Sequence, residues 1–339
     1  MVTRQAREAN VPRILITDSI AQEGIDLLRY ELPEAQIDVR LDLSPEHLLA
    51  LIGTYTVLLV RSQTRVTEEL LAKATHLQLI GRAGSGLDNI DLHAAIRHGV
   101  LVVHAPRGNT IAVSEQTMAL LLALARHLPA ANRSLKAGKW DKNRLLGVEL
   151  HQKVLGVIGL GRVGTEVAHK AQAFGMRVIA SDPLVSPRRA QQIGVTLHSK
   201  EEVLQRADFV TLHATLTEER EGRKLLGARE LSLLKPGAYL VNCARGNLID
   251  EQALLAALME GRLAGVALDV FSQEPIGEDT ILRQLLAHER VLATPHLGAS
   301  TVEAQVRVAT EMVRNIISAL RGDTLYGVAM LPLPPTKPA

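Results

Sequence analysis

Three polar side chains in this sequence have the combined chemistry to move a proton beside a bound anion. Arg245 and His296 each follow a short apolar run, and Glu274 lies in the loop after another such run. Arginine holds carboxylates, histidine takes up or returns a hydroxyl proton, and a carboxylate beside the histidine tunes its pKa. Each residue alone is more commonly a surface charge, a turn residue or a structural histidine. The prediction therefore depends on their combination at successive strand ends.

A glycine-rich turn indicates a second kind of chemistry, the binding of a pyrophosphate. Gly159, Gly161 and Gly164 follow a short apolar run and open an amphipathic helical pattern. The first glycine permits a tight bend, the second lets the backbone approach phosphates at the helix start, and the third allows the helix to pack on the strand. Asp182, about 20 residues further on, is placed to bind ribose hydroxyls. The pattern predicts NAD rather than NADP, although the nearby pair Arg188-Arg189 can soften that preference.

The elements that must position these residues are short apolar runs alternating with amphipathic stretches, which indicates an α/β fold with parallel sheets covered by helices on both faces. The 339 residues suggest about two domains. Residues Ser114–Leu128 are apolar almost all round, which predicts a helix buried between domains or at a dimer interface. The predicted strands are Arg13–Thr17, Val57–Arg61, Leu77–Gly81, Val100–His104, Val154–Gly159, Arg177–Ser181, Phe209–His213, Ala238–Asn242, Gly265–Val270 and Val291–Thr294.

Composition excludes several classes of function. Aromatic residues make up 2% of the chain and the net charge is +2, without a basic run longer than a pair, so we expect no nucleic-acid partner. The one cysteine, Cys243, excludes an intrachain disulfide and a thiolate cluster, and we expect no metal. No apolar segment approaches the about 20 residues of a membrane span, and the first residues lack the apolar core of a secretory signal. We therefore expect a cytoplasmic protein that has no membrane partner.

Longer motifs around these residues resemble the D-isomer-specific 2-hydroxyacid dehydrogenase family. The resemblance covers nearly the whole chain and is carried by Gly81–Asp91, Ala105–Asn109, Leu160–Gly164, Asn242–Gly246, Asp269–Phe271, Glu274–Pro275 and Pro295–Thr301. It implies a Rossmann-type doubly wound parallel sheet inserted into a smaller, flavodoxin-like αβ substrate domain. The substrate-binding domain would comprise residues 1–104 and 296–339, and the NAD-binding domain would comprise residues 105–295.

The resemblance also implies roles for individual residues. Arg245 would bind the carboxylate and carbonyl oxygen of the substrate, His296 would exchange the proton, and Glu274 would raise the pKa of His296. The predicted cofactor-binding residues are Gly159, Gly161, Arg162, Val163, Gly164, Asp182, Cys243, Ala244, Asp269, Gly298 and Ala299. The predicted substrate-binding residues are Arg61, Ser62, Ser85 and Gly86.

The stretch Pro295–Thr301 favours the branch of the family that acts on a phosphorylated substrate. We therefore expect NAD-dependent oxidation of D-3-phosphoglycerate to 3-phosphohydroxypyruvate, the first step toward serine. The alternatives are a glyoxylate or hydroxypyruvate reductase of the same family and a non-catalytic, NAD-sensing protein similar to a corepressor.

Residues Lys139–Lys142 resemble an intersubunit segment, so we expect a homodimer or homotetramer in which Arg144 is a candidate to reach a neighbouring site. The sequence ends at Ala339, which leaves no room for the regulatory domain of longer members. We therefore expect no serine feedback through such a domain.

Five residues depart from the family pattern or admit another interpretation. His104 stands where an asparagine is usual, Ala214-Thr215 replaces a Thr-Pro pair, and Asn247 replaces the second glycine after Arg245. If that position needs a positive φ, asparagine is the best-tolerated substitute. Cys243 has no evident histidine partner in sequence, so we expect a small buried residue at the cofactor rather than a nucleophile.

Overall fold

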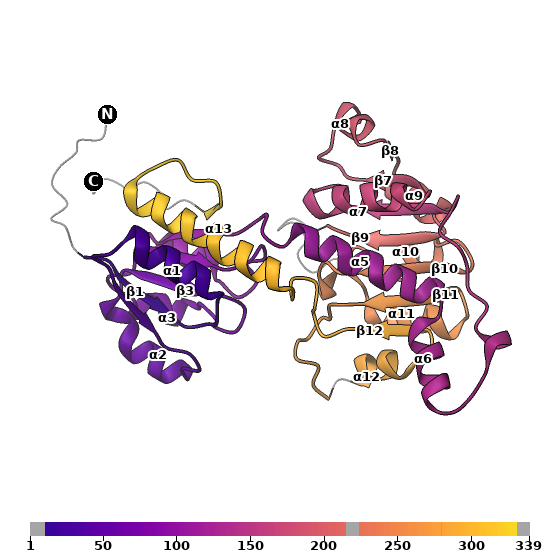
Figure 1. Cartoon of the computed structure of the whole chain (residues 1–339), viewed down its shortest axis with the longest axis horizontal. Helices are drawn as coiled ribbons and strands as arrows, with labels where there is room; N and C mark the ends of the chain where they lie inside the picture. Colours follow the sequence, from indigo (N-terminus) through magenta and orange to yellow (C-terminus); the bar gives the residue numbers. More distant parts are fainter. Residues whose placement is uncertain (1–10, 215–223, 279, 331–339) are drawn as a thin grey trace. The chain divides into compact units, whose positions relative to one another are not determined.

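The computed structural model describes residues 11–214, 224–278 and 280–330, which form two compact units (Figure 1). The first unit contains residues up to Asn109 and those from Thr301 onward, and the second unit runs from Thr110 to Ser300. Both junctions lie a few residues beyond the domain boundaries that the sequence predicts. The second unit thus includes His296 as well as the glycine turn.

The first unit is built on a six-stranded sheet in the order β13-β5-β4-β3-β1-β2. The five strands from β1 to β5 run parallel in the flavodoxin-like order, and β13 adds an antiparallel edge beside β5. The strands are β1 (Arg13–Ile16), β2 (Gln36–Val39), β3 (Val57–Val60), β4 (Leu79–Arg82), β5 (Leu101–His104) and β13 (Val328–Met330). The helices are α1 (Gln22–Glu31), α2 (Pro45–Leu51), α3 (Glu68–Lys73), α4 (Leu92–Arg97) and α13 (Val302–Arg321).

Alternate side chains of these strands enter two separate cores, because successive residues of a strand point to opposite faces of the sheet. Leu15 and Leu58 face the core formed with α2, α3 and α4. Ile14 and Leu59 face the core formed with α1 and α13. A side chain at Gly81 of β4 would meet the Cδ1 atom of Ile316 at 2.4 Å, so the absence of one there lets α13 lie directly on the sheet.

The second unit is built on a seven-stranded parallel sheet in the order β12-β11-β10-β9-β6-β7-β8. Strand order reverses between β6 and β9, as in a Rossmann fold that carries one additional strand. The strands are β6 (Val154–Ile158), β7 (Arg177–Ser181), β8 (Thr196–Leu197), β9 (Phe209–Leu212), β10 (Ala238–Asn242), β11 (Leu263–Leu268) and β12 (Val291–Ala293). The predicted fold class is therefore confirmed.

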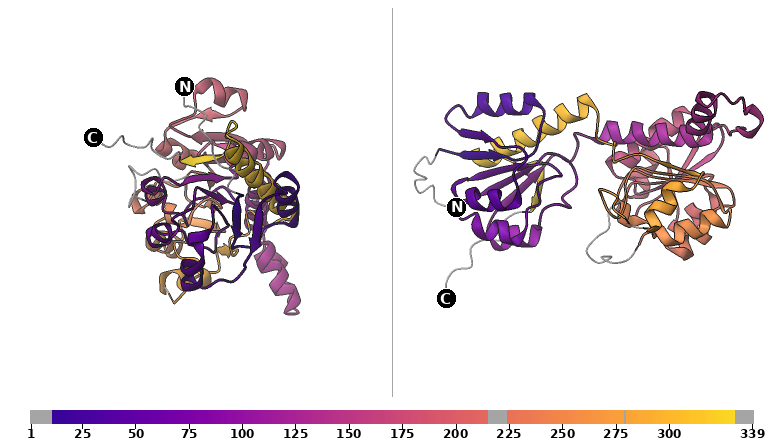
Figure 2. Two further views of the ribbon diagram at one scale, coloured as in Figure 1. Left: turned by 90° about the vertical axis from the view of Figure 1, so that its left-hand side faces the viewer. Right: turned by 90° about the horizontal axis from the view of Figure 1, so that it is seen from below.

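Helices cover both faces of this sheet. Figure 2, right, shows α5 on one side and the helices drawn in orange on the other. Leu155 and Val241 enter the core beneath α5 and α7, whereas Val210 and Leu240 enter the core beneath α9 to α12. The helices are α5 (Thr110–Ala125), α6 (Leu128–Lys136), α7 (Arg162–Ala173), α8 (Pro187–Gln192), α9 (Lys200–Arg206), α10 (Ala228–Ser232), α11 (Glu251–Met259) and α12 (Thr280–Ala287).

The nearly all-apolar helix predicted at residues 114–128 is α5, and its apolar character follows from the core of the second unit. Leu121 and Ala125 are fully buried and pack with residues of α7 and of the sheet. No helix in the described residues is long and apolar enough to cross a membrane.

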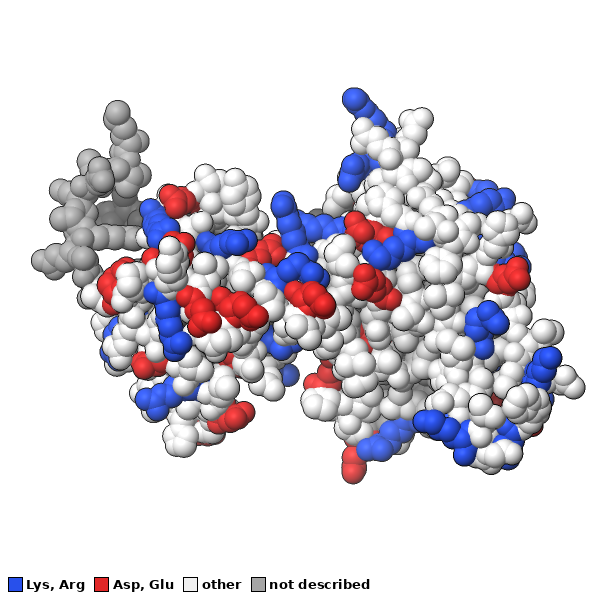
Figure 3. Space-filling view, viewed as in Figure 1, with Lys and Arg blue, Asp and Glu red and all other residues white. Residues whose placement is uncertain are grey.

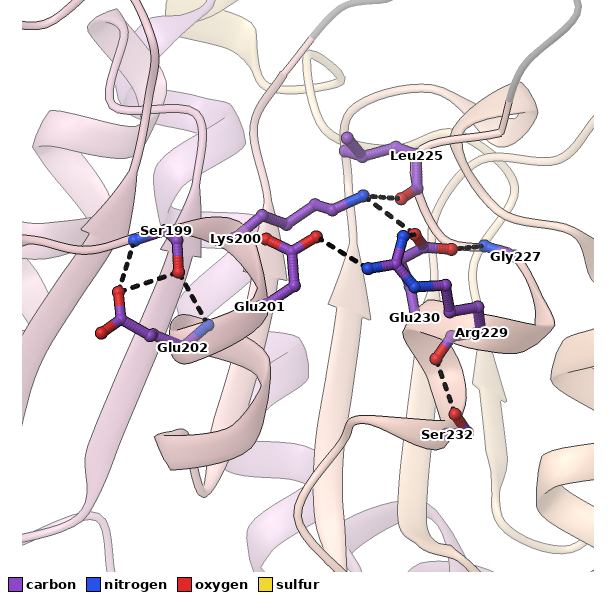
Figure 4. A network of polar contacts seen from close by, with 9 residues as sticks. All are labelled: Ser199, Lys200, Glu201, Glu202, Leu225, Gly227, Arg229, Glu230 and Ser232. Atoms are coloured by element: carbon purple, nitrogen blue, oxygen red, sulfur yellow. Dashed lines mark hydrogen bonds and ion pairs between the residues drawn. The ribbon is translucent and has the colours of Figure 1, made fainter.

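A polar network connects the starts of α9 and α10 (Figure 4). Ser199 and Glu202 form a capping box at the first turn of α9. The Nζ atom of Lys200 donates hydrogen bonds to the carbonyl oxygen of Leu225 and to Glu230, both at 3.2 Å. Because Glu230 also accepts from the Gly227 N–H, the network holds the start of α10 against the start of α9.

Candidate functional site

The glycine turn lies at the point where strand order reverses in the second unit. Gly159 follows β6 with a φ of +95°, and a side chain there would meet the backbone of His213, after β9, at 2.6 Å. A side chain at Gly164 would meet the Gly159 carbonyl oxygen at 2.1 Å, whereas Gly161 faces open space. The first and third glycines are thus required for packing, and the second leaves room for a ligand at the start of α7. In parallel sheets, ligands bind at this reversal of strand order.

Asp182, directly after β7, contacts the glycine turn. Its carboxylate accepts a hydrogen bond from the Leu160 N–H at 2.7 Å and another from the Leu184 N–H at 2.8 Å. Arg162 and Val163 form the first turn of α7, with Arg162 exposed. The structure therefore gathers the glycines, Asp182 and the start of α7 at one place.

Arg245 follows β10 in a loop braced by Asn242. The side chain of Asn242 accepts from the Ala244 N–H at 3.0 Å and donates to the Arg245 carbonyl oxygen at 2.9 Å. A side chain at Gly246 would lie 1.9 Å from the carbonyl carbon of Phe271. This loop and the loop that carries Glu274 are therefore in direct backbone contact. Asn247 lies in a short 3-10 helix without a positive φ, so asparagine there needs no left-handed conformation.

Glu274 and His296 form the central pair of the site. The Oε2 atom of Glu274 lies 2.6 Å from Nδ1 of His296, and the Oε1 atom accepts from the Phe271 N–H at 2.9 Å. The imidazole is 51% exposed, and in the described residues its Nε2 atom has no hydrogen-bond partner. Glu274 thus orients the ring through Nδ1 and leaves Nε2 open.

The electrostatics of the pair keep opposite charges on its two members. The hydrogen bond to Glu274 raises the pKa of His296, and the charges of Glu274 and Asp269 add to this, while partial burial and Arg245 oppose it. Burial alone would raise the pKa of Glu274, but hydrogen bonds from His296 and the Phe271 N–H, with the charges of His296 and Arg245, lower it overall. Arg245 therefore lies close enough to act on both, and the structure brings all three predicted catalytic residues together.

Asp269 organises the loop in which His296 stands. This fully buried carboxylate accepts hydrogen bonds from the Leu297 and Gly298 N–H groups, both at 2.8 Å, and from the hydroxyl of Thr294 at 2.5 Å. His296 itself has a φ of +54°, an uncommon conformation that this network stabilises. The sequence assigns Asp269 to the cofactor; in the structure its hydrogen bonds hold the loop of His296.

Cys243 lies under the same strand ends. Burial raises the pKa of its thiol to about 12, with the charge of Asp269 adding and a hydrogen bond with Thr117 opposing. A thiol of this kind stays protonated at neutral pH, so the structure does not support a nucleophilic role.

The four predicted substrate residues lie in the first unit, at the carboxyl ends of β3 and β4. Asn89, after β4, donates to the carbonyl oxygens of Arg61 and Thr64 at 2.9 and 2.7 Å, which joins the two loops. Burial lowers the pKa of Arg61, and the charge of Asp18 opposes this. The predicted residues Arg61 and Ser62 thus share one sheet edge with Ser85 and Gly86.

Several residues that shape these loops escaped sequence reasoning. Asp18, which is 2% exposed, accepts hydrogen bonds from the backbone N–H groups of Arg61, Gln63 and Thr64. The position of Asp18 after β1 is the feature of the sequence from which this role could have been predicted, because a carboxylate at a strand end can accept hydrogen bonds from the backbone of a neighbouring loop. His104, the unusual residue, forms a 3.0 Å contact between Nδ1 and the Ser85 carbonyl oxygen. Thr215 lies outside the described residues. No group of metal-ligating side chains occurs in the described part of the chain.

This site defines an α/β dinucleotide-binding protein with an arginine and a Glu-His pair at its strand ends. Residues 118–298 match the model of the D-isomer specific 2-hydroxyacid dehydrogenase NAD binding domain. The chain belongs to this family, and the predicted NAD cofactor is confirmed.

Individual relatives support the same assignment. The chain is 45% identical to a D-3-phosphoglycerate dehydrogenase of Synechocystis sp. over 93% of its length and 55% of the relative's. It is 44% identical to a D-3-phosphoglycerate dehydrogenase of Bacillus subtilis over 94% of its length and 59% of the relative's. The chain therefore spans less than two thirds of these curated relatives. A solved structure of a Thermus thermophilus protein superposes with a TM-score of 0.84 at 33% identity, covering 94% of this chain and all of that one.

Proposed function

We propose that the protein oxidises D-3-phosphoglycerate to 3-phosphohydroxypyruvate with NAD, the first step toward serine. The observation that carries this proposal is the Glu274–His296 pair, with Nε2 of His296 open and Arg245 near both side chains. A pair of this kind is suited to exchange a proton with a hydroxyl group while a cation holds the adjacent carboxylate.

His296 serves as the general base in the oxidation. Its Nε2 atom takes the proton of the substrate hydroxyl as the carbonyl bond forms, and Glu274 stabilises the resulting imidazolium through Nδ1. Arg245 binds the substrate carboxylate and, as the carbonyl oxygen forms, orients it. The chemistry that bound NAD supplies is acceptance of a hydride from the hydroxyl-bearing carbon. Gly161, which faces open space at the start of α7, fits the close approach of its pyrophosphate.

The phosphate of the substrate is assigned to the loop of Arg61 and Ser62, with Ser85 and Gly86 on the neighbouring loop. Arg61 supplies a cation, and the backbone around it is held by Asp18. The two relatives named as phosphoglycerate dehydrogenases favour this substrate over glyoxylate or hydroxypyruvate.

The test is a steady-state comparison of D-3-phosphoglycerate with glyoxylate, hydroxypyruvate and D-lactate, each with NAD or NADP in the matching redox state. Arg61→Ala should raise the KM for phosphoglycerate at least about tenfold and change glyoxylate reduction little, because one charge-assisted contact to phosphate is lost. Arg65→Ala is the matched control, since Arg65 is an exposed arginine four residues further along. An unchanged KM in Arg61→Ala would remove the basis for a phosphorylated substrate.

A second experiment separates catalysis from sensing. His296→Asn should abolish turnover while NADH binding, measured by fluorescence, stays intact. A wild-type protein that binds NADH but turns over none of these substrates would instead support the NAD-sensing alternative.

The homo-oligomer belongs to the same proposal. α6 and the loop after it extend away from the sheet of the second unit (Figure 1) and carry exposed apolar side chains, including Trp140 and Leu146 at 82% and 87% exposure. An apolar surface of this kind favours a second copy of the chain. Trp140→Glu together with Leu146→Glu should lower the mass measured by light scattering to that of one chain. An unchanged mass would contradict this interface.

A further inference from the structure

A groove of about 750 Å³ lies on the first unit, along α13, and the proposed function leaves it without a role. It is lined by residues of α1 and α13, by Arg107 and Gly108 after β5, and by Tyr326 before β13. Figure 3 shows blue side chains of Lys and Arg gathered over α13, interspersed with red ones. All the residues that form this groove belong to the first unit.

Three arginines of the groove recur at intervals of seven residues along α13. Arg307, Arg314 and Arg321 therefore lie on one face of the helix, because seven residues make almost two full turns. At a rise of 1.5 Å per residue, successive arginines are about 10 Å apart along the axis. Arg107 adds a fourth guanidinium from the segment after β5.

The two carboxylates of the groove, Glu31 and Glu311, compensate half of the charge of its four arginines and leave a net charge of +2. Glu31 accepts from Arg321 at 2.9 Å, and Glu311 accepts from the backbone N–H of Arg107 at 3.2 Å. Among residues 11–214, 224–278 and 280–330, the guanidinium groups of Arg107, Arg307 and Arg314 form no salt bridge. Arg307 donates a hydrogen bond to the carbonyl oxygen of Gly108, through Nε at 3.2 Å.

The backbone beneath these side chains is tightly fixed. A side chain at Gly108 would meet the backbone of Val308 at 2.8 Å, so the segment that carries Arg107 lies directly on α13. Asn315, which is 6% exposed, donates to the carbonyl oxygen of His104 at 2.7 Å. The helix and the segment after β5 thus hold Arg107, Arg307 and Arg314 along one rigid surface.

We propose that this groove binds a small molecule that carries a chain of phosphate groups. Guanidinium groups bind phosphates with charge-assisted hydrogen bonds, and the long side chains of Arg107, Arg307 and Arg314 lie where more than one of them can converge on a single chain of phosphates. The exposed ring of Tyr326 supplies a surface on which a nucleotide base stacks, and its neighbour Gly327 lies against Asn315 and His104, next to the turn of α13 that carries Arg314. The ligand class is an oligophosphate, either free or as part of a nucleoside polyphosphate.

The experiment is isothermal titration calorimetry of the whole chain with two probes, inorganic tripolyphosphate and ATP. Saturating NADH is present throughout, so that ATP does not report the cofactor turn. The Arg61→Ala variant is titrated in parallel, so that the proposed substrate loop does not account for the signal. The expected result is one binding event per chain in both proteins, with an affinity that falls as ionic strength rises.

Arg314→Gln should weaken the binding of both probes about tenfold or more, since a charge-assisted contact is lost from an exposed side chain. Arg29→Gln on α1 removes the same charge from the same unit outside the groove and should change affinity less than about twofold. Thermal unfolding of both variants should match the parent protein.

Three outcomes decide the proposal. Absence of binding by either probe overturns it, as does binding that Arg314→Gln leaves unchanged. Loss of binding in Arg314→Gln but not in Arg29→Gln supports it. Tyr326→Ala then distinguishes a free oligophosphate from a nucleoside polyphosphate. If a base stacks on the ring, this variant has a lower affinity for ATP and an unchanged affinity for tripolyphosphate. Equal effects on the two affinities overturn the inference that a base stacks on Tyr326. These outcomes are independent of phosphoglycerate oxidation, which is measured without either probe.

Discussion

The charge of Glu274 should set both the rate and the pH range of catalysis. Glu274→Gln keeps the size and shape of the side chain but removes its charge and one of its two acceptor oxygens. The single amide oxygen of the variant accepts from either the Phe271 N–H or the Nδ1–H of His296, so the charged hydrogen bond that stabilises the imidazolium is lost. A hydrogen bond to an ionised group contributes about 1.5 to 3 kcal/mol. Because the two side chains are 35% and 51% exposed, solvent screening reduces this to about 1 to 2 kcal/mol. We expect kcat/KM to fall roughly 5- to 30-fold, which follows from this range.

The direction of the pH effect follows from the roles of the two protonation states. Oxidation needs a neutral His296 and rises with pH through its pKa, whereas reduction needs the imidazolium and falls through the same pKa. Glu274 raises the pKa of His296. Without that charge the pKa falls, so in Glu274→Gln both limbs should move to lower pH, and near neutrality reduction should lose more than oxidation.

The assay is kcat/KM for phosphoglycerate oxidation and phosphohydroxypyruvate reduction from about pH 5 to pH 10, a range that spans the histidine titration. NADH affinity should stay unchanged, which separates the effect from cofactor binding. Glu278→Gln, an exposed acid of the same loop, is the matched control. If Glu274→Gln shows unshifted profiles and rates within about twofold of the parent at every pH, the pair does not work as described.

Three further predictions follow from close contacts and burial. Gly164→Ala should destabilise the protein by about 1 to 3 kcal/mol in urea unfolding, because its new methyl group meets a carbonyl oxygen at 2.1 Å, whereas Gly161→Ala should weaken NADH binding without changing stability. Equal loss of stability in both variants would contradict this assignment. Gly246→Ala should lower both kcat/KM and the free energy of unfolding, because it separates the loop of Arg245 from that of Glu274. An active and stable variant would show that this backbone contact is not required. Cys243 should resist iodoacetamide at about pH 8 in the folded protein and react once unfolded, as the raised pKa of its buried thiol requires; rapid labelling of the native protein would be inconsistent with that.

The sequence was sufficient to predict the strands that carry the site, because buried parallel strands are continuous apolar runs. The structure places β7 and β10 at the predicted residues. The strands it failed to predict are edge strands: β2 is partly exposed, β8 has two residues, and β13 pairs on one side only. β2 and β8 lack the apolar run because edge strands are buried on fewer sides, whereas β13 is apolar but only three residues long.

Contacts that depend on tertiary structure were beyond sequence reasoning. The closeness of Arg245, Glu274 and His296 was predictable, since parallel strands end at a common edge. The left-handed backbone of His296 and its stabilisation by Asp269 were not, because both depend on where a buried carboxylate lies after folding.

An acidic residue at a strand end can either bind a ligand or hold a neighbouring loop, and the two units of this protein show why sequence alone does not distinguish these roles. Asp18, Asp182 and Asp269 each follow a strand, and each accepts backbone N–H groups of a neighbouring loop. A carboxylate has about four acceptor positions, so a loop contact does not exhaust it. Asp182, which is partly exposed and accepts two N–H groups, retains capacity for ribose hydroxyls, whereas fully buried Asp269 already accepts three hydrogen bonds. Exposure and remaining acceptor capacity, rather than position after a strand, therefore distinguish a carboxylate with acceptor positions left for a ligand from one engaged by the loop of His296.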